Sequence, residues 1–468
     1  MNHIVAVLLA VAFLSVATAP DARTNDYPPP PKANQPISVK DSVYGVLRTH
    51  RSLRGMQENR EVLEHEVRRA QAGFGPRVDV TARGGSSQYS DSSTRSQDLD
   101  DRLYGFVGLS AQLVQPIWDG FATRSRVRSA RSTLESQKHR VFDTATSLSL
   151  DGIIAHIDLL RRRSIYKLAE ENVDRHKELV VQAEDRAALG ADTAADVTQA
   201  QSRMQRALSS LSETKASLLV AENTYTRLTG LSANGNLQPV TMPPQVFSKA
   251  VDVLDLAIKS NPKLAAYFHD IRAARAEREL AESAFYPSLN LEAGPNYTDR
   301  GGSDDRWIYS FDALGVARWN IFNSGADVAE YRAASARVRQ ARQVMHNYLD
   351  DLKLDVDSTW TNYLAAQEQY EHYGKAIEYN KYTLGAYIEQ FQIGKRSILD
   401  VLDAQNEFYN SSTQAETARG NILVGAYRLS ALTGTMLQAM SIDTKPLAKK
   451  PQRDPEDPRE PFAPGWFD

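Results

Sequence analysis

The sequence predicts a membrane protein that combines amphipathic β-strands with unusually long α-helices, in a unit that occurs twice along the chain. Three observations give this prediction. Two long stretches contain no proline, several landmarks of the first half return in the second half at a fixed offset, and each half holds two stretches in which apolar and polar residues alternate.

The proline-free stretches are where long helices are expected. No proline lies between Pro116 and Pro239 or between Pro295 and Pro446. Because a proline inside a helix costs about 3 kcal/mol, helices can run through these stretches without a break. From Gly325 to Gly394 such a helix would be roughly 100 Å long. Its apolar residues recur every three or four positions, as in a coiled-coil seam.

The duplication is visible in four landmarks that recur 204 residues later. They are Leu189-Gly190 and Ile393-Gly394, Asp196-Val197 and Asp400-Val401, Ala200-Gln201 and Ala404-Gln405, and Leu228-Thr229-Gly230 and Leu432-Thr433-Gly434. Chance agreement of four landmarks at one offset is improbable, and it indicates an internal repeat.

Each repeat also contains two stretches with a period of two. Trp307, Tyr309 and Phe311 begin one apolar face that continues to Trp319, and Val78 and Val80 begin another. Alternation with tryptophan near the ends is typical of transmembrane β-strands, whose aromatic residues lie at the membrane interfaces. Alternation alone would also fit a soluble β-sandwich. The apolar N-terminal segment and the scarcity of strands elsewhere favour the membrane.

The predicted organisation has six parts. Residues 4–17 are almost wholly apolar and too short to span a bilayer, so residues 1–19 are interpreted as a secretory signal peptide rather than a buried core helix. The other parts are a Pro-rich linker (20–41), a first repeat (42–230), a second linker (231–250), a second repeat (251–434) and a Pro-rich tail (435–468). Each repeat is expected to hold a helix, two strands and a long helix pair.

Composition excludes several classes of function. The net charge of −3 argues against nucleic acid as a partner, and a mean hydropathy of −0.45 excludes a helical integral-membrane protein. Cysteine is absent, so no disulfide, Cys metal cluster or lipidated N-terminal Cys is expected. The nine histidines are scattered, and no hydrolase, Walker or dinucleotide motif occurs. We therefore predict no catalytic residues, cofactor or metal.

The chain resembles the TolC-like outer-membrane efflux and secretion proteins. The resemblance covers nearly all of residues 42–434. It is carried by Asn261-Pro262-Lys263-Leu264, by Tyr286-Pro287-Ser288-Leu289, by Trp319-Asn320-Ile321-Phe322 and, above all, by the segment from Gly394 to Gln405. It implies a homotrimer in which three chains give four strands each to a twelve-stranded β-barrel in the outer membrane. The long helices would continue as an α-helical barrel, a tunnel across the periplasm that closes near Gly190 and Gly394.

The resemblance also directs attention to charged residues near Gly394. Asp400 and Asp403 share one helix face, and threefold symmetry would make them a ring of carboxylates that attracts cations. Asp196 and Asp400 also fit a capping-box pattern with Thr193 and Ser397, so either could serve mainly to start a helix. Asp403 replaces Gln199 of the first repeat, which makes it the stronger candidate for a gate.

Three further residues are candidates for ties that hold the gate closed. By resemblance, Arg396 would pair with Asp196, and Phe391 would occupy the position of an aromatic tie residue. The alternative for Arg396 is an exposed arginine that contributes little. Trp307 and Trp319 are the expected membrane-interface aromatics.

The function predicted from these features is that of a passive, gated duct of a type I secretion system that exports protein. Its partners would be a periplasmic adaptor, an inner-membrane ABC transporter and outer-membrane lipid. One alternative is the outer-membrane component of a tripartite multidrug efflux pump, driven by a proton-coupled transporter. A different class is a periplasmic coiled-coil adaptor without a pore.

Overall fold

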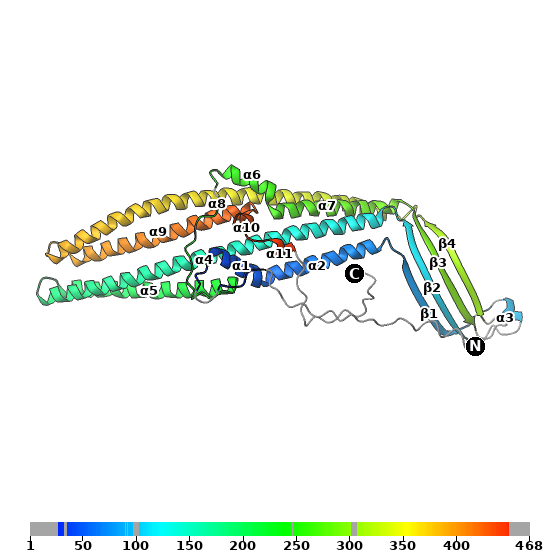
Figure 1. The fold of residues 1–468 in the computed structure, drawn as a ribbon, viewed down its shortest axis with the longest axis horizontal. Helices are drawn as coiled ribbons and strands as arrows, with labels where there is room; N and C mark the ends of the chain where they lie inside the picture. The colour runs from blue at the N-terminus through cyan, green and yellow to red at the C-terminus, as the bar shows by residue number, and fades with distance from the viewer. Residues whose placement is uncertain are drawn as a thin grey trace.

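The computed structural model describes residues 27–31, 35–88, 90, 92–96, 103–245, 247–300 and 307–448. The predicted signal peptide, residues 1–19, lies outside the described residues, as do residues 449–468 of the predicted tail. The described chain is elongated, with a sheet at one end and the tips of two helical hairpins at the other (Figure 1).

Four antiparallel strands form one sheet in the order β1-β2-β3-β4. They are β1 (Arg77–Ser87), β2 (Tyr104–Trp118), β3 (Ser288–Arg300) and β4 (Trp307–Arg318). Directly paired residues of neighbouring strands point to the same face. One row across the sheet is Val78, Leu113, Ala293 and Ala313, and another is Ala82, Leu109, Tyr297 and Tyr309. The predicted apolar residues of the two repeats therefore share one face.

The opposite face of the sheet carries most of its charged residues, together with the apolar Ile308, Leu314 and Val316 of β4. Glu292 accepts hydrogen bonds from Gln112 at 3.2 Å and from Arg318 at 2.9 Å, so it links β2, β3 and β4. On the apolar face, Trp319 Nε1 donates a hydrogen bond to the Phe285 carbonyl at 3.2 Å, next to the helix end of the sheet. Trp307 is 65% exposed and Trp319 is 58% exposed. The sheet thus separates a more polar face from an apolar one that nothing in the described chain covers.

Helices make up most of the remaining chain. The long ones are α1 (Val39–Thr49), α2 (Arg51–Ala72), α4 (Ala122–Ala188), α5 (Ala194–Thr229), α6 (Ala250–Ser260), α7 (Pro262–Glu282), α8 (Ala326–Gln392) and α9 (Ile398–Leu432). Short ones are α3 (Ser92–Ser96), η1 (Ser283–Phe285), α10 (Met436–Ala439) and α11 (Lys445–Ala448). With 67 residues each, α4 and α8 are about 100 Å long, as the proline-free stretches predict.

The helix expected at the start of the second repeat is two helices, α6 and α7, broken at Asn261. Pro262 occupies the first turn of α7, and a residue before proline is driven out of the helical conformation. The Asn261 side chain accepts a hydrogen bond from the backbone N–H of Leu264 at 3.0 Å and donates one to the Leu432 carbonyl at 2.9 Å. The break therefore ties the start of α7 to the end of α9. The helix expected before β1 is likewise divided, at the extended His50.

Helices near the sheet form a layer in strand order, because each one continues a strand. α2 packs on α4, α4 on α7 and α7 on α8. Farther from the sheet, α4 forms a hairpin with α5, α8 forms one with α9, and α4 and α9 join the two hairpins (Figure 1). Among the described residues, none of the helices combines the length and apolarity needed to cross a membrane.

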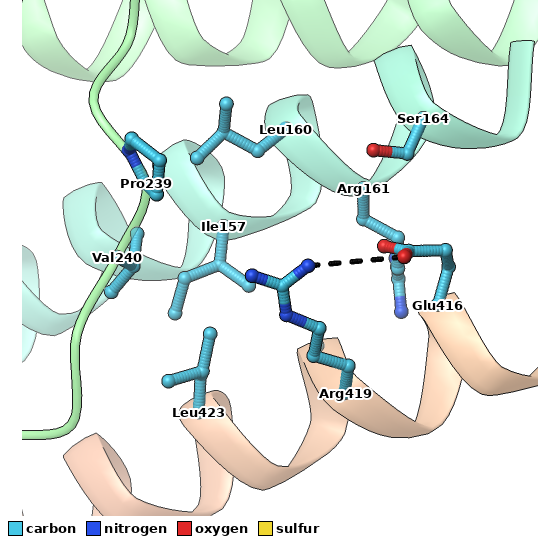
Figure 2. Close-up of a pocket in the computed structure, with 10 residues that line it drawn as sticks. Ile157, Leu160, Arg161, Ser164, Pro239, Val240, Glu416, Arg419 and Leu423 are labelled. Carbon is cyan, nitrogen blue, oxygen red and sulfur yellow. Dashed lines mark ion pairs between the residues drawn. The ribbon is translucent and has the colours of Figure 1, made fainter. Parts of the chain in front are cut away.

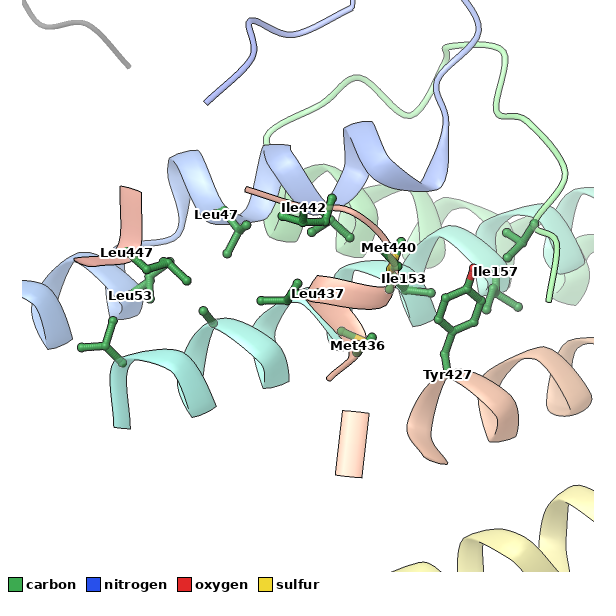
Figure 3. Packing of buried hydrophobic residues seen from close by; sticks show 14 residues of the cluster. Leu47, Leu53, Ile153, Ile157, Tyr427, Met436, Leu437, Met440, Ile442 and Leu447 are labelled. Carbon is green, nitrogen blue, oxygen red and sulfur yellow. The ribbon is translucent and has the colours of Figure 1, made fainter. Parts of the chain in front are cut away.

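The largest apolar cluster lies midway along the molecule and includes a segment that the sequence analysis assigned to the tail. Met436, Leu437, Met440 and Ile442 pack against Ile153 of α4 and Tyr427 of α9 (Figure 3). Farther along, the buried Arg60 of α2 donates a hydrogen bond to the Leu447 carbonyl at 2.9 Å. Residues 436–448 are thus a strap across α1, α2 and α4.

Candidate gate at the helix tips

Both helical hairpins turn at their tips in the same way. Gly190 and Gly394 have φ of +73° and +72°, in the left-handed region that favours glycine. The following N–H groups, of Ala191 and Lys395, donate to the carbonyls of Arg186 and Gln390 at 2.9 and 2.8 Å. This bond closes a helix C-terminus in the Schellman manner. The repeat predicted from the sequence is therefore also a repeat of tip geometry.

A side-chain contact crosses each turn at equivalent positions of the two repeats. In the first hairpin Arg186 pairs with Asp192, its Nε lying 3.0 Å from Oδ2. In the second hairpin Arg396 Nε donates to Gln390 Oε1 at 3.2 Å. The arginine comes before the turn in one hairpin and after it in the other.

Arg186 also joins the two hairpins to each other. Its Nη1 donates to the Phe391 carbonyl at 3.1 Å, and its guanidinium lies 4.7 Å from the centre of the Phe391 ring. The Phe391 side chain is 1% exposed and belongs to an apolar cluster built from α4, α5, α8 and α9. One arginine therefore makes an ion pair, a hydrogen bond and a cation–π contact at the junction.

In the single chain, Arg396 contacts residues of its own hairpin. Within the described part of the single chain, no hydrogen bond or ion pair joins it to Asp196. Instead it lies 3.6 Å from Asp400 and 4.0 Å from the ring centre of Tyr387, both in its own hairpin. Of the predicted tie residues, Phe391 lies at the junction between the hairpins, and its partner there is Arg186.

The three predicted aspartates have different surroundings. Asp196 closes a capping box with Thr193, whose hydroxyl donates to it at 2.7 Å, and the hydrogen bonds from Thr193 lower the pKa of the Asp196 carboxyl. Asp400 does not close a box, since Ser397 accepts from the N–H of Leu399 instead. Asp403 is 62% exposed and lies 2.9 Å from Arg203 of α5.

Behind the Asp403–Arg203 pair lies a buried histidine that the sequence analysis did not single out. His176 of α4 is 4% exposed, and burial, together with nearby Arg203, lowers the pKa of its ring. One turn before it, Asn172 accepts a hydrogen bond from Gln405 of α9 at 2.9 Å. Arg203, His176 and Asn172 thus line the seam between the first hairpin and α9.

Arg186 and Arg203 were also missed, although the repeat held a signal for both. The positions 204 residues later hold Gln390 and Glu407, so the second repeat has an uncharged residue in place of Arg186 and an acidic one in place of Arg203. The same asymmetry had identified Asp403.

A buried Ser–His pair elsewhere does not form an active site. Ser42 Oγ lies 2.8 Å from His156 Nδ1 and 2.8 Å from the Tyr225 hydroxyl, and His156 Nε2 lies 3.0 Å from the Gln238 carbonyl. All three side chains are fully enclosed, and burial lowers the pKa of His156. A substrate cannot reach this group. It fastens α1 to α4, α5 and the second linker.

A hollow of about 150 Å³ lies between α4, α9 and the second linker (Figure 2). Ile157, Val240 and Leu423 give it apolar walls. Its charged residues are paired, Arg419 with Glu416 at 3.8 Å and Arg161 with Asp158. Among the described residues, no group of three or more His, Asp or Glu side chains is arranged to hold a metal ion. The tips are therefore the candidate site.

Comparison with known proteins agrees with this geometry. A sequence model of the outer membrane efflux proteins matches residues 43–231 and 253–435, one match for each repeat. The outer membrane efflux protein BepC of Brucella suis is 26% identical over 75% of this chain and 76% of its own. The alkaline protease secretion protein AprF of Pseudomonas aeruginosa is 23% identical over 81% of each chain. The solved structure of the outer membrane protein VceC from Vibrio cholerae has the same fold, with a TM-score of 0.72, 18% identity, and coverage of 85% of this chain and 96% of that one.

Proposed function

Because this chain belongs to the outer membrane efflux protein family, we propose that three copies of it form one gated duct that serves a type I protein-secretion system. The chain is an outer-membrane channel protein that extends into the periplasm, and it is not an enzyme. Membership of this family also sets aside a periplasmic adaptor without a pore.

The sheet supports a trimer because it has two free edges. β1 and β4 each pair with only one neighbour among the described strands. An open edge invites pairing with another strand, and closing a sheet into a barrel removes it. Three copies, each joining its β4 to the β1 of the next, would close a barrel of twelve strands. Its apolar face, with Trp307 and Trp319, would contact outer-membrane lipid.

The tips support a gate because the polar contacts that join them, beside one apolar cluster, are few in number. Arg186 with Phe391, Arg203 with Asp403, and Gln405 with Asn172 join the first hairpin to the second. In a trimer, Asp400 and Asp403 would ring the inner opening and favour cations. We propose that a periplasmic adaptor loosens the tip contacts, and that an inner-membrane ABC transporter supplies the energy.

The proposal of type I secretion is supported chiefly by one observation, the similarity to AprF along four fifths of both chains. AprF is named for the secretion of a protein, alkaline protease. The likeness to BepC, an efflux protein, favours the second candidate, a duct for a tripartite multidrug efflux pump with a proton-driven transporter. The same fold and the same gate would serve either partner.

The absence of cysteine makes the test direct. A single cysteine introduced as Ser202→Cys, exposed on α5 near the tip, can carry a photo-crosslinker in intact cells. Ser358→Cys, exposed on α8 far from the tip, is the control. An adaptor captured only at position 202, and copurifying with an ABC transporter, would support type I secretion. Copurification of a proton-driven pump would instead support the second candidate, a duct for drug efflux.

A further inference from the structure

A row of contacts runs from the apolar face of the sheet onto the surface of α4. Trp118 pairs with Leu289, which belongs to the apolar face. The ring of Phe121 meets Trp118 edge-on at 4.5 Å, and the guanidinium of Arg124 lies 6.0 Å from the centre of the Phe121 ring. Arg124 therefore stands on the same side of the molecule as the apolar strand face.

Other arginines continue this side of the helical layer. Arg128 and Arg131 follow Arg124 by four and seven residues, so the three share one face of α4. Arg128 forms an ion pair with Glu279 of α7, and Arg275 lies one turn before Glu279 on the same face of that helix. We call Arg124, Arg128, Arg131 and Arg275 the arginine collar.

The collar has an excess of positive charge in a chain whose net charge is −3. All four arginines are exposed, and Glu279 is the one carboxylate that the described chain pairs with any of them. Exposed arginines keep their charge and present several N–H donors that match phosphate oxygens. The collar therefore fits an anionic, phosphate-bearing partner.

The position of the collar identifies that partner. Arg124 and Arg128 lie about 5 and 10 Å along the helix from Phe121, and Arg131 about 15 Å. The headgroup layer of a bilayer is about 5–8 Å thick on each side, and arginine side chains can reach toward it. The exposed aromatic residues Trp118, Phe121 and Trp319 mark the boundary of the apolar zone.

We propose that the arginine collar binds the headgroups of anionic phospholipids in the periplasmic leaflet of the outer membrane. The proposal rests on the proposed function in one respect, that the apolar strand face contacts lipid. Because three chains would repeat the collar around the barrel, it would surround the channel with anionic lipid and fix its depth in the membrane.

Tryptophan quenching by brominated lipids tests this in full-length protein reconstituted into phosphatidylcholine vesicles. A background with Trp307→Phe, Trp360→Phe and Trp466→Phe leaves Trp118 and Trp319 as the two reporters, at the helix end of the strands. Quenching by brominated phosphatidylglycerol is compared with quenching by brominated phosphatidylcholine. We expect a preference for phosphatidylglycerol that weakens as salt is added.

The decisive variant carries Arg124→Gln, Arg131→Gln and Arg275→Gln, which leaves the Arg128–Glu279 pair in place. The ratio of binding to phosphatidylglycerol over phosphatidylcholine, measured by quenching, should fall by about fivefold for each arginine removed. The control carries Lys167→Gln, Arg175→Gln and Lys177→Gln, which removes the same charge farther along α4, and it should keep the preference. If the triple variant fails to insert, the salt titration of the parent protein still decides the question.

Three outcomes would contradict the proposal, and each has a different meaning. Equal quenching by both lipids in the parent protein would overturn the collar while leaving the membrane-embedded duct intact. An equal loss of preference in the control would assign the effect to net charge and not to this surface. No quenching by either lipid would mean that the strand face does not contact lipid, and the proposed function itself would fail.

Discussion

Arg186 lies over the ring of Phe391, and through this contact the helical hairpin of the first repeat holds that of the second. The two residues are 205 positions apart in the chain. Both belong to the region where the two tips meet, and the equivalent positions of the other repeat hold Gln390 and Ala187, so neither residue has a counterpart of similar chemistry. The contact is therefore a product of divergence between the repeats.

Replacing Arg186 with Ala should open the closed channel. The change removes the charge-assisted hydrogen bond from Arg186 to the Phe391 carbonyl, which joins the two hairpins and is worth about 1.5–3 kcal/mol, so the open fraction should rise by about tenfold or more. Single-channel recordings in planar bilayers would show this as more frequent open events. Arg175→Ala, which breaks an exposed ion pair on the same helix, is the control, and equal behaviour of the two variants would remove Arg186 from the gate.

Replacing Asp403 with Ala should change ion selectivity more than stability. Because Asp403 is largely exposed, its pair with Arg203 contributes at most about 1 kcal/mol. Its charge would nevertheless line the inner opening of a trimer. We expect a larger conductance and a weaker preference for cations, measured as the reversal potential across a salt gradient. Asp196→Ala removes a capping carboxylate instead, and a shift of the same size there would argue against a special role for Asp403.

The tip should loosen as the pH falls, because of His176. Burial lowers the pKa of this ring below its ordinary value of 6.5, so the unfolded chain takes up the proton more readily than the folded one. Stability is therefore complete above the ordinary pKa and decreases as the pH falls below it. Hydrogen exchange of peptides over residues 172–183 should accelerate between about pH 7.5 and about pH 5 after correction for intrinsic rates.

In His176→Gln that acceleration should disappear, while peptides around His156, whose pKa is also lowered by burial, should respond as in the parent protein. A tip whose exchange keeps its pH dependence without His176 would contradict this assignment.

Placing glutamate at both Trp307 and Trp319 should prevent insertion into the outer membrane. The two side chains belong to the apolar face, where a charge at the membrane boundary costs up to about 2–4 kcal/mol depending on depth. The amount of heat-resistant trimer in outer-membrane fractions measures the effect. Asn290→Glu with Ser310→Glu places the same charges on the polar face, and normal insertion of the tryptophan variant would contradict the strand assignment.

Replacing Arg60 with Ala should release the strap of residues 436–448. The variant leaves the buried Leu447 carbonyl without its donor, at a cost of about 1–3 kcal/mol. Hydrogen exchange in the strap should rise, and the midpoint of thermal unfolding should fall. Arg69→Ala, which removes an exposed arginine of the same helix, should change neither, and an unaltered strap in Arg60→Ala would show that its apolar side chains alone hold it.

The features that depend on local pattern could be predicted from the sequence. The strand faces follow from a period of two, so Trp307, Tyr309 and Phe311 identified one face of β4 before its partners were known. The turns at Gly190 and Gly394 follow from backbone conformation and from the repeat. The resemblance to the TolC-like proteins is confirmed by the family match and by relatives named TolC.

What could not be predicted depends on which elements meet. Arg186 contacts Phe391 only because the end of α4 lies close to the end of α8. The pairing of Arg203 with Asp403 requires α5 to lie close to α9. Within the single chain, Arg396 and Asp196 each have partners in their own hairpin, so their predicted pairing stays a prediction for the trimer. The strap was missed because helices as short as α10 have almost no local stability and form only through packing.

The shorter helix of the second hairpin, α9, is fixed at its base. Just beyond its last residue, Gly434 is so closely packed that an added Cβ would lie 2.4 Å from Pro262. Near the tip, Gln405 and Asp403 join α9 to the first hairpin beside the apolar cluster described above. A helix of 35 residues is about 50 Å long, so a tilt of about 10° at the base would displace its far end by about 9 Å. We therefore expect α9 to act as a lever, in which loosening the contacts at its tip would produce a movement wide enough to change the width of the channel.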